Sequence, residues 1–440
     1  MSLLTFKGGV HPPEKKLSEN QSIKRLPLPQ TVFMYTSNNL GAPSKIIVSV
    51  GDKVKTGQLI AQANGLISAN LHSSVTGEVV EIKKLVNSAT GMNDDVVVIN
   101  RDGEEEWELL EHSENFLSMS SEQIVDTVKQ AGIVGLGGAM FPAHVKMMIP
   151  KDKKAEILII NTAECEPYIT IDDRIMIEYS EKIITGIRII MHATGARKAF
   201  IGIEDNKPSS YECMKNAAKD YPIEIARLKT KYPQGAEKQL IYGVTKREVP
   251  SGKLPIDVGC VVFNVSTVYA VYDAVVNGRP LVERGISLTG EGVKNPGNFI
   301  FRIGTKVSEL LDYVGLIEED KIDRIIYGGP MMGIPLSNVE LPTFKGNNAI
   351  TVLTKDVVDS RQVKPCIRCS RCVHVCPMFL QPYLLKHLSD SRQYDTAIEN
   401  GLMDCMECGC CSYTCPSDID LVKSFKTAKK VIRAMKQRRP

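Results

Sequence analysis

Two cysteine runs near the C-terminus place the strongest constraint on this chain. Each run has three cysteines at intervals of three residues, a fourth cysteine four residues later, and then a proline: Cys366, Cys369, Cys372, Cys376 and Pro377, then Cys405, Cys408, Cys411, Cys415 and Pro416. Three thiolates at this spacing reach three irons of one 4Fe-4S cubane, whereas the fourth ligates the other cluster. The spacing therefore predicts two clusters with crossed ligands, and a chain through which electrons pass.

The crossed pattern assigns eight thiolates to the two clusters. The first predicted cluster is held by Cys366, Cys369, Cys372 and Cys415, and the second by Cys405, Cys408, Cys411 and Cys376. The other four cysteines, Cys165, Cys213, Cys260 and Cys410, suit a role mainly as small buried hydrophobes.

Two other uses of these cysteines fit the sequence less well. Structural zinc uses paired Cys-x2-Cys knuckles and needs neither a third cysteine at the same interval nor a proline after the last. Disulfides need an oxidising compartment, but residues 1–9 lack the apolar run and cleavage site of a secretory signal. We therefore interpret the runs as cluster ligands in a cytoplasmic setting.

Length and composition indicate a multidomain globular protein. A chain of 440 residues is too long to fold around one hydrophobic core, so three or four domains are expected. A net charge of +3 gives no reason to expect nucleic acid as a partner. The most apolar stretch, residues 258–276, is interrupted by Asn264, Ser266 and Asp273, so any membrane contact is expected to be peripheral.

Short alternating strands with glycine turns fill residues 48–61 and 67–82 and predict a small β-sandwich. This pattern resembles the barrel-sandwich hybrid of biotinyl and lipoyl carrier domains. Those carriers place a modifiable lysine on the hairpin between the halves, but residues 64–66 are Asn-Gly-Leu. We expect a docking or structural module.

A glycine-rich loop follows a predicted helix at 120–131, which opens on a capping box formed by Ser120 and Gln123. The loop, residues 135–138, runs into Pro142, whereas a Rossmann loop would follow a strand and open a helix. Its bare amides, with Lys146 nearby, suit a phosphate or a flavin; a plain turn is the alternative.

A buried strand at 155–160 ends in Asn161, Glu164 and Glu166, where α/β folds place ligand contacts. A solvated loop is the alternative here. A helix predicted at 183–193 and a strand at 199–203 continue the alternation and indicate an α/β domain.

These segments resemble the flavin-binding elements of the NADH-oxidising flavoprotein subunit of respiratory complex I. Segments 232–237 and 264–267 are similar to that family in the same order. The resemblance implies non-covalent FMN bound by Gly135, Gly137, Gly138, Lys146, Asn161, Tyr232, Gly235, Asn264 and Thr267. It implies NADH contacts from Phe141, Glu164, Glu166 and Glu237, with no catalytic acid or base. Departures from the family stand at Leu136, Met140, Ala163, Ala236 and Ser266.

Two further modules follow the flavin segment. Strands at 286–289 and 299–303 with a helix at 306–314 resemble the soluble-ligand-binding β-grasp module, as a ligand site or as a spacer, and residues 328–333 are interpreted as a turn. Between the cysteine runs, helix formers at 383–388 and 394–399 resemble the α-helical ferredoxin domain of succinate dehydrogenase.

The chain ends in a predicted amphipathic helix. Its apolar face is formed by Phe425, Ala428, Ile432 and Met435. Its basic residues are Lys423, Lys426, Lys429, Lys430, Arg433, Lys436, Arg438 and Arg439. The basic face is solvated, or it meets anionic lipid or an acidic ferredoxin.

The complete module order, with the start Phe6-Lys-Gly-Gly-Val-His-Pro-Pro-Glu14, resembles the RnfC family of the Rnf ion-translocating electron-transport complexes. The predicted fold is multidomain α+β: a barrel-sandwich hybrid domain with an N-terminal extension at 1–112, an α/β flavin domain at 113–280, a β-grasp domain at 281–350, and an α-helical two-cluster ferredoxin domain at 351–440.

This resemblance implies a peripheral subunit on the cytoplasmic side of a cell membrane. It would pass electrons between ferredoxin-derived one-electron carriers and NAD through two 4Fe-4S clusters and FMN, with NAD(H) as substrate. Its partners would be the other subunits of the complex, including an iron-sulfur ferredoxin-like subunit. Two alternatives stay open: a soluble flavin and iron-sulfur reductase of the cobalamin reductase type, and a non-catalytic electron relay.

Overall fold

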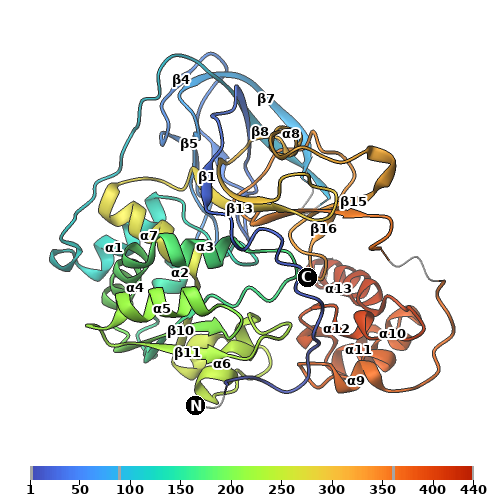
Figure 1. The fold of residues 1–440 in the computed structure, drawn as a ribbon. Helices are drawn as coiled ribbons and strands as arrows, with labels where there is room; N and C mark the ends of the chain where they lie inside the picture. The colour runs from blue at the N-terminus through green and yellow to red at the C-terminus, as the bar shows by residue number, and fades with distance from the viewer. Residues whose placement is uncertain (1–2, 88–90, 359–361, 439–440) are drawn as a thin grey trace.

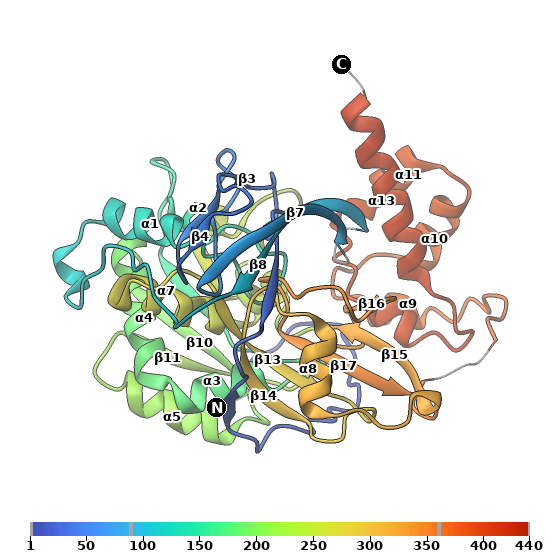
Figure 2. The same cartoon turned by 90° about the horizontal axis from the view of Figure 1, so that it is seen from above.

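The computed structural model describes residues 3–87, 91–358 and 362–438. Figure 1 shows four units: a blue β-domain above, a green α/β domain below it, an orange domain with strands and a helix beside it, and a red helical domain at the lower right. Turned by 90°, the last helix projects away from the other units (Figure 2).

The first unit is a β-sandwich of two antiparallel sheets, as predicted. One sheet has the strand order β2-β8-β7-β4 and the other β3-β5-β6. The strands are β2 (Thr31–Tyr35), β3 (Lys45–Ile46), β4 (Lys53–Val54), β5 (Leu59–Gln62), β6 (Leu71–His72), β7 (Gly77–Asn87) and β8 (Met92–Arg101). Val97 and Ile99 of β8 pack with Ile60 and Leu71 in the core, which joins the two sheets.

The second unit is an α/β domain around a parallel sheet of order β11-β10-β9-β12. Its strands are β9 (Ile157–Asn161), β10 (Lys198–Glu204), β11 (Ile223–Leu228) and β12 (Cys260–Asn264). Its helices are α1 (Ser121–Gln130), α2 (Ala143–Met147), α3 (Ile171–Glu178), α4 (Ser180–Thr194), α5 (Pro208–Ala218), α6 (Glu237–Thr245) and α7 (Val265–Asn277), after a short 3-10 turn at Phe116–Ser118. The buried run Leu158–Ile160 suits a parallel strand covered on both faces.

The capping box predicted for the first helix is confirmed. The Ser120 hydroxyl accepts the Gln123 amide at 3.2 Å, and the Gln123 side chain accepts the Ser120 amide at 2.7 Å. The glycine-rich loop follows α1 and passes Pro142 into the short α2. It therefore has neither a strand before it nor the long helix of a Rossmann site.

The third unit is a six-stranded sheet of order β1-β14-β13-β17-β15-β16. Its elements are β1 (Ile23–Arg25), β13 (Glu283–Thr289), β14 (Gly297–Arg302), α8 (Val307–Val314), β15 (Ile322–Tyr327), β16 (Ile334–Leu336) and β17 (Ala349–Thr354). The edge strand β1 comes from the N-terminal segment and runs parallel to β14, with Ile23 opposite Asn298. The predicted boundary after residue 350 falls inside β17. The residues of this strand therefore come from both the predicted β-grasp domain and the predicted ferredoxin domain.

The fourth unit is helical, with α9 (Arg371–His374), α10 (Pro382–Asp390), α11 (Tyr394–Glu399), α12 (Cys410–Tyr413) and α13 (Leu421–Arg438). The two helices predicted between the cysteine runs are confirmed by α10 and α11. Leu385, Leu402 and Phe425 form the centre of its core. No helix in residues 3–87, 91–358 and 362–438 combines the length and the apolar character that crossing a membrane requires.

The terminal helix α13 buries most of its predicted apolar face. Phe425, Ala428 and Ile432 are buried, whereas Met435 on the same face is 46% exposed. The C-terminal end of this helix projects away from the other units (Figure 2). The side chains of Lys436 and Arg438, and Arg439 altogether, lie outside the described residues.

Candidate functional site

The glycine-rich loop lies at the carboxyl ends of β9 and β12. Asn161 and Asn264 end these neighbouring strands and stand opposite each other in the sheet register. A Cβ atom on Gly137 would lie 2.7 Å from Nδ2 of Asn264, so only glycine allows this approach. On Gly138 a Cβ would meet nothing within 4 Å, which leaves its backbone open to a ligand.

Four predicted flavin residues are connected at this edge by hydrogen bonds. Nδ2 of Asn161 donates to the Gly235 carbonyl at 2.7 Å. The hydroxyl of Thr267 accepts the Leu136 amide at 2.9 Å, and Asn264 accepts the amides of Ser266 and Thr267 as the N-cap of α7. The structure therefore brings the loop, both asparagines, Gly235 and Thr267 together.

Lys146 on α2 reaches the same edge of the sheet. Its ammonium donates to Oε1 of Glu237 at 2.9 Å and to the Val262 carbonyl of β12 at 3.2 Å. Phe141 is half-buried, and its carbonyl accepts the Gly135 amide at 2.8 Å, which closes the base of the loop. Lys146, which is predicted to bind FMN, and Glu237, which is predicted to contact NADH, are therefore hydrogen-bonded to each other.

Tyr232 points into the helical domain. Its side chain is 1% exposed, and its hydroxyl donates to the Cys408 carbonyl at 2.7 Å. Its backbone also pairs with Val10 in both directions, at 2.8 and 2.9 Å. The segment that follows, from Gly235, belongs to the flavin edge, so Tyr232 connects that edge to the second cysteine run.

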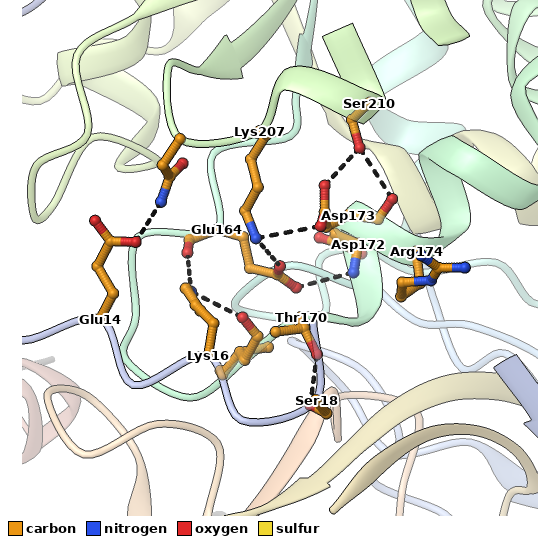
Figure 3. Close-up of polar contacts among 12 residues, drawn as sticks. Glu14, Lys16, Ser18, Glu164, Thr170, Asp172, Asp173, Arg174, Lys207 and Ser210 are labelled. Carbon is orange, nitrogen blue, oxygen red and sulfur yellow. Dashed lines mark hydrogen bonds and ion pairs between the residues drawn. The ribbon is translucent and has the colours of Figure 1, made fainter. Parts of the chain in front are cut away.

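Glu164 lies in a buried polar network (Figure 3), and Glu166, which is half-buried, lies two residues further on. Oε1 of Glu164 accepts the Asp172 amide at 2.8 Å. The carboxylate of Glu166 accepts the amides of Met331 and Met332 at 3.0 and 2.8 Å, which anchors the turn predicted at 328–333.

Two lysines supply positive charge to this network. Nζ of Lys16 donates to the carbonyls of Glu164, Glu166 and Ile169 at 2.7, 2.8 and 2.8 Å. Nζ of Lys207 lies 3.3 Å from Oδ2 of Asp173 and 4.0 Å from Oε2 of Glu164 (Figure 3).

Burial and neighbouring charges together set the protonation of these groups. Burial raises the pKa of Glu164 to about 7, although Lys207 and Lys16 oppose the shift. It opposes the charge on Lys207, but Glu164 and Asp173 outweigh it and leave the pKa of Lys207 raised. Oε2 of Glu164 has no hydrogen-bond partner in the described structure, so the network holds one unsatisfied buried carboxylate oxygen.

Asp172 connects this network to the flavin edge. The sequence analysis did not identify this residue. Its carboxylate accepts Nδ2 of Asn264 at 2.7 Å and the Ser266 hydroxyl at 2.5 Å. Burial raises the pKa of Asp172, and these two donors partly offset the shift. The partners of Asp172 lie 92 and 94 residues away, so no local pattern marks it.

The second cysteine run and the last cysteine of the first run share one cavity. Cys376, Cys405, Cys408 and Cys411 all line it, with apolar residues such as Leu385 and Phe425 completing its wall. This is the ligand set predicted for the second cluster, so the donors present fit a 4Fe-4S cluster with a ligand from the other run. Amides donate to two of its thiols, Leu380 to Cys376 and Glu407 to Cys405, both at 3.4 Å.

The first cluster's predicted ligands lie nearer the surface. Cys366 and Cys369 are exposed, and Cys372 and Cys415 are half-buried. In the described residues no three His, Cys, Asp or Glu side chains converge on a single ion. Ligands of a cubane bind separate irons and stand around the cluster, so they need not converge in that way.

Comparison with protein families supports the same division of the chain. Residues 4–104 match the RnfC barrel sandwich hybrid domain, and residues 128–273 the Nuo51 FMN-binding domain. Residues 286–335 match the SLBB domain, and residues 359–416 a 4Fe-4S dicluster domain. The predicted fold class and cofactors are confirmed: the chain is an iron-sulfur flavoprotein with FMN and 4Fe-4S clusters.

Relatives identify the family. One relative, from a proton-translocating ferredoxin:NAD(+) oxidoreductase complex of Clostridium ljungdahlii, is 45% identical over 90% of this chain and 87% of the relative. Another, from a Na(+)-translocating ferredoxin:NAD(+) oxidoreductase complex of Acetobacterium woodii, is 40% identical over 99% of this chain and 98% of the relative. The chain belongs to the RnfC family, whose members are subunits of the Rnf ion-translocating oxidoreductase complexes.

A solved structure shares the fold at low identity. A chain of the NAD+-reducing [NiFe]-hydrogenase in the air-oxidized state has a TM-score of 0.51 and 19% identity, covering 71% of this chain and 63% of that one. This likeness concerns the arrangement of the elements alone.

Proposed function

We propose that this chain is the NAD(H)-facing peripheral subunit of a membrane-bound ion-translocating complex, on the cytoplasmic side of the membrane. It exchanges electrons between ferredoxin-derived one-electron carriers and NAD, through two 4Fe-4S clusters and FMN. The relatives from Clostridium ljungdahlii and Acetobacterium woodii are named as ferredoxin:NAD(+) oxidoreductase subunits, which supports the two ends of this route. Its partners are the complex's other subunits, including an iron-sulfur ferredoxin-like one.

The contact between the flavin domain and the second cysteine run carries this proposal. Tyr232 leads directly into the flavin edge at Gly235, and its hydroxyl donates to the Cys408 carbonyl at 2.7 Å. Nε2 of Gln239, on α6, donates to the carbonyl of Pro377 at 3.1 Å. Both cysteine runs therefore touch the segment that carries the flavin residues.

Exposure supports an order for the two cluster sites. The cavity of the second site includes buried Cys376, Cys408 and Cys411, and two residues that line it, Pro377 and Cys408, accept hydrogen bonds from the flavin domain. The first site has exposed Cys366 and Cys369, which are accessible to a protein partner. We assign the first site to the partner side and the second to the flavin side.

A flavin exchanges two electrons with a nicotinamide and one at a time with an iron-sulfur cluster. The chain's own residues position these groups and need no catalytic acid or base. The open backbone of Gly138 and the ammonium of Lys146 suit the FMN phosphate.

The dinucleotide contacts divide into two kinds. Phe141 and Glu237 are partly exposed beside the glycine loop and would meet the dinucleotide directly. Contact from Glu164 or Glu166 requires that carboxylate to leave its present amide partners. In the resting arrangement these two glutamates instead hold the shape of the segment between β9 and α3.

One titration separates this function from its alternatives. The protein is purified anaerobically and reconstituted with iron and FMN, and NADH and then dithionite are added while flavin absorbance and cluster EPR are followed. Bleaching of the flavin by NADH supports the dehydrogenase half-reaction, and bleaching by dithionite alone supports a non-catalytic relay. Recovery of the chain from membranes with other subunits, rather than from the soluble fraction, separates the complex subunit from a soluble reductase.

A further inference from the structure

The N-terminal strap, residues 4–18, runs between the flavin domain and the helical domain, as the blue trace in Figure 1 shows. It begins on the flavin sheet, where Leu4 bridges to Leu228 at the end of β11. It ends in the polar network of Figure 3, where Ser18 lies 2.6 Å from the Thr170 hydroxyl. The strap is therefore held on the flavin domain at both ends.

In the middle of the strap, consecutive residues touch the two domains in turn. The Gly9 amide donates to the carbonyl of Val375 at 2.8 Å, immediately before the cluster ligand Cys376. The next residue, Val10, pairs with Tyr232 through two backbone hydrogen bonds. The strap thus connects the loop that ends in Cys376 to the segment that leads into the flavin edge.

Neither Gly8 nor Gly9 has room for a side chain. A Cβ on Gly8 would lie 2.9 Å from the Cys376 carbonyl oxygen, and a Cβ on Gly9 would lie 2.5 Å from the Tyr232 carbonyl oxygen. Both distances fall below the 3.4 Å at which ordinary contact begins, and both neighbours are backbone. Both glycines also have positive φ angles, +81° and +80°.

A small apolar cluster lies beside this point. Val10 and Tyr232 form one buried cluster with Cys408 and Cys410 of the second run. Met331, from the turn anchored by Glu166, packs against the same cluster. The strap, the flavin segment and the cluster loop therefore meet in a closely packed junction.

We propose that Gly8 and Gly9 are positioning residues that set the separation between the second cluster site and the flavin edge. The inference rests on the proposed electron transfer between those two sites. The two glycines form the thinnest spacer a polypeptide can supply, with the Cys376 backbone against one and the Tyr232 backbone against the other. Any side chain there pushes the two sites apart by several tenths of an ångström or breaks the hydrogen bonds across the junction.

Gly9→Ala and Gly8→Ala test this role, with Gly195→Ala as the matched control. Gly195 also has a positive φ, +74°, but a Cβ there would meet nothing within 4 Å. All three variants share the backbone strain of a side chain at positive φ, and only the first two crowd the junction. Iron and FMN content are measured first in each reconstituted protein.

The decisive measurement is electron transfer from flavin to cluster after photochemical reduction of the flavin without NADH. We expect Gly9→Ala to slow this step relative to Gly195→Ala, because a larger separation weakens electron transfer, with unchanged iron and FMN. Gly8→Ala should have a smaller effect, because its clash is less severe, and Gly195→Ala should match the wild type. A Gly9→Ala rate equal to the control overturns the assignment, as does loss of iron or FMN, which would indicate a folding role.

Hydrogen exchange of the protein without cofactors gives a second readout. The amides of Gly9, Val10 and Tyr232 are hydrogen-bonded across the junction and should be protected in the wild type. Gly9→Ala should lose this protection while the β9 and β12 peptides keep theirs. Unprotected junction amides in the wild type would overturn the inference. Because neither readout uses NADH, failure of the proposed NAD activity is detected separately in the NADH titration.

Discussion

Lys345 lies where three domains meet, and replacing it should change how stability depends on pH. Its side chain is 1% exposed. Its ammonium donates to the Asn70 carbonyl of the β-sandwich at 2.7 Å and to the Gly132 carbonyl of the flavin domain at 2.8 Å. Burial alone lowers the pKa of Lys345 from its ordinary 10.5 to about 7.

The direction of the effect follows from this lowered pKa. Between pH 7 and 10.5 the unfolded chain holds a proton on Lys345 that the folded chain has released. The unfolded state binds more protons there, so the free energy of unfolding rises with pH across this window. From pH 7 to pH 9 this single group should add about 2 kcal/mol to the free energy of unfolding.

Lys345→Met removes this titration and keeps an apolar chain of similar length. It also removes two hydrogen bonds, a loss of about 1 kcal/mol each. Urea unfolding is measured for wild type and variant at pH 7, 8 and 9. Between pH 7 and pH 9 the free energy of unfolding should rise by about 2 kcal/mol more in the wild type than in the variant. Lys24→Met, at an exposed lysine, should follow the wild type. Parallel pH dependences for wild type and Lys345→Met would refute the reasoning.

Three further predictions concern the cofactor sites. Cys376→Ser should weaken the EPR signal of the second cluster and Cys415→Ser that of the first; damage confined to each substituted residue's own run would contradict crossed ligation. Lys146→Ala should lose FMN and retain both clusters, as measured by flavin fluorescence and iron content, and full flavin occupancy would count against the phosphate role. Tyr232→Phe leaves the Cys408 carbonyl without its donor at 2.7 Å and should lower the free energy of unfolding by about 1 kcal/mol in urea; an unchanged value would show that this bond contributes nothing to stability.

Local sequence patterns predicted the elements well where the determining contacts are local. The capping box of Ser120 and Gln123 spans three residues, and the structure confirms it. The apolar run of β9 predicted a buried strand, and parallel strands bring their carboxyl ends to one edge. Asn161 and Asn264, which end β9 and β12, stand opposite each other at that edge.

Patterns failed where a long-range contact decides the outcome. The sequence places the residues of β1 in the N-terminal extension. In the structure this strand pairs with β14 in the β-grasp sheet, with Ile23 opposite Asn298. The direction of the Tyr232 side chain depends on a partner 176 residues away. Nothing near Tyr232 in the sequence distinguishes a hydroxyl aimed at a flavin from one aimed at a cysteine loop.

The cysteine spacing by itself determined the chemistry of this protein, because four thiolates must reach irons of a cubane from short loops. It also predicted that Cys376 belongs with the second run, and the shared cavity supports that pairing. Only the tertiary structure decided which cysteines lie against the flavin domain. That choice depends on the backbones of Gly8, Tyr232 and Cys376, which folding brings into contact from three distant parts of the chain.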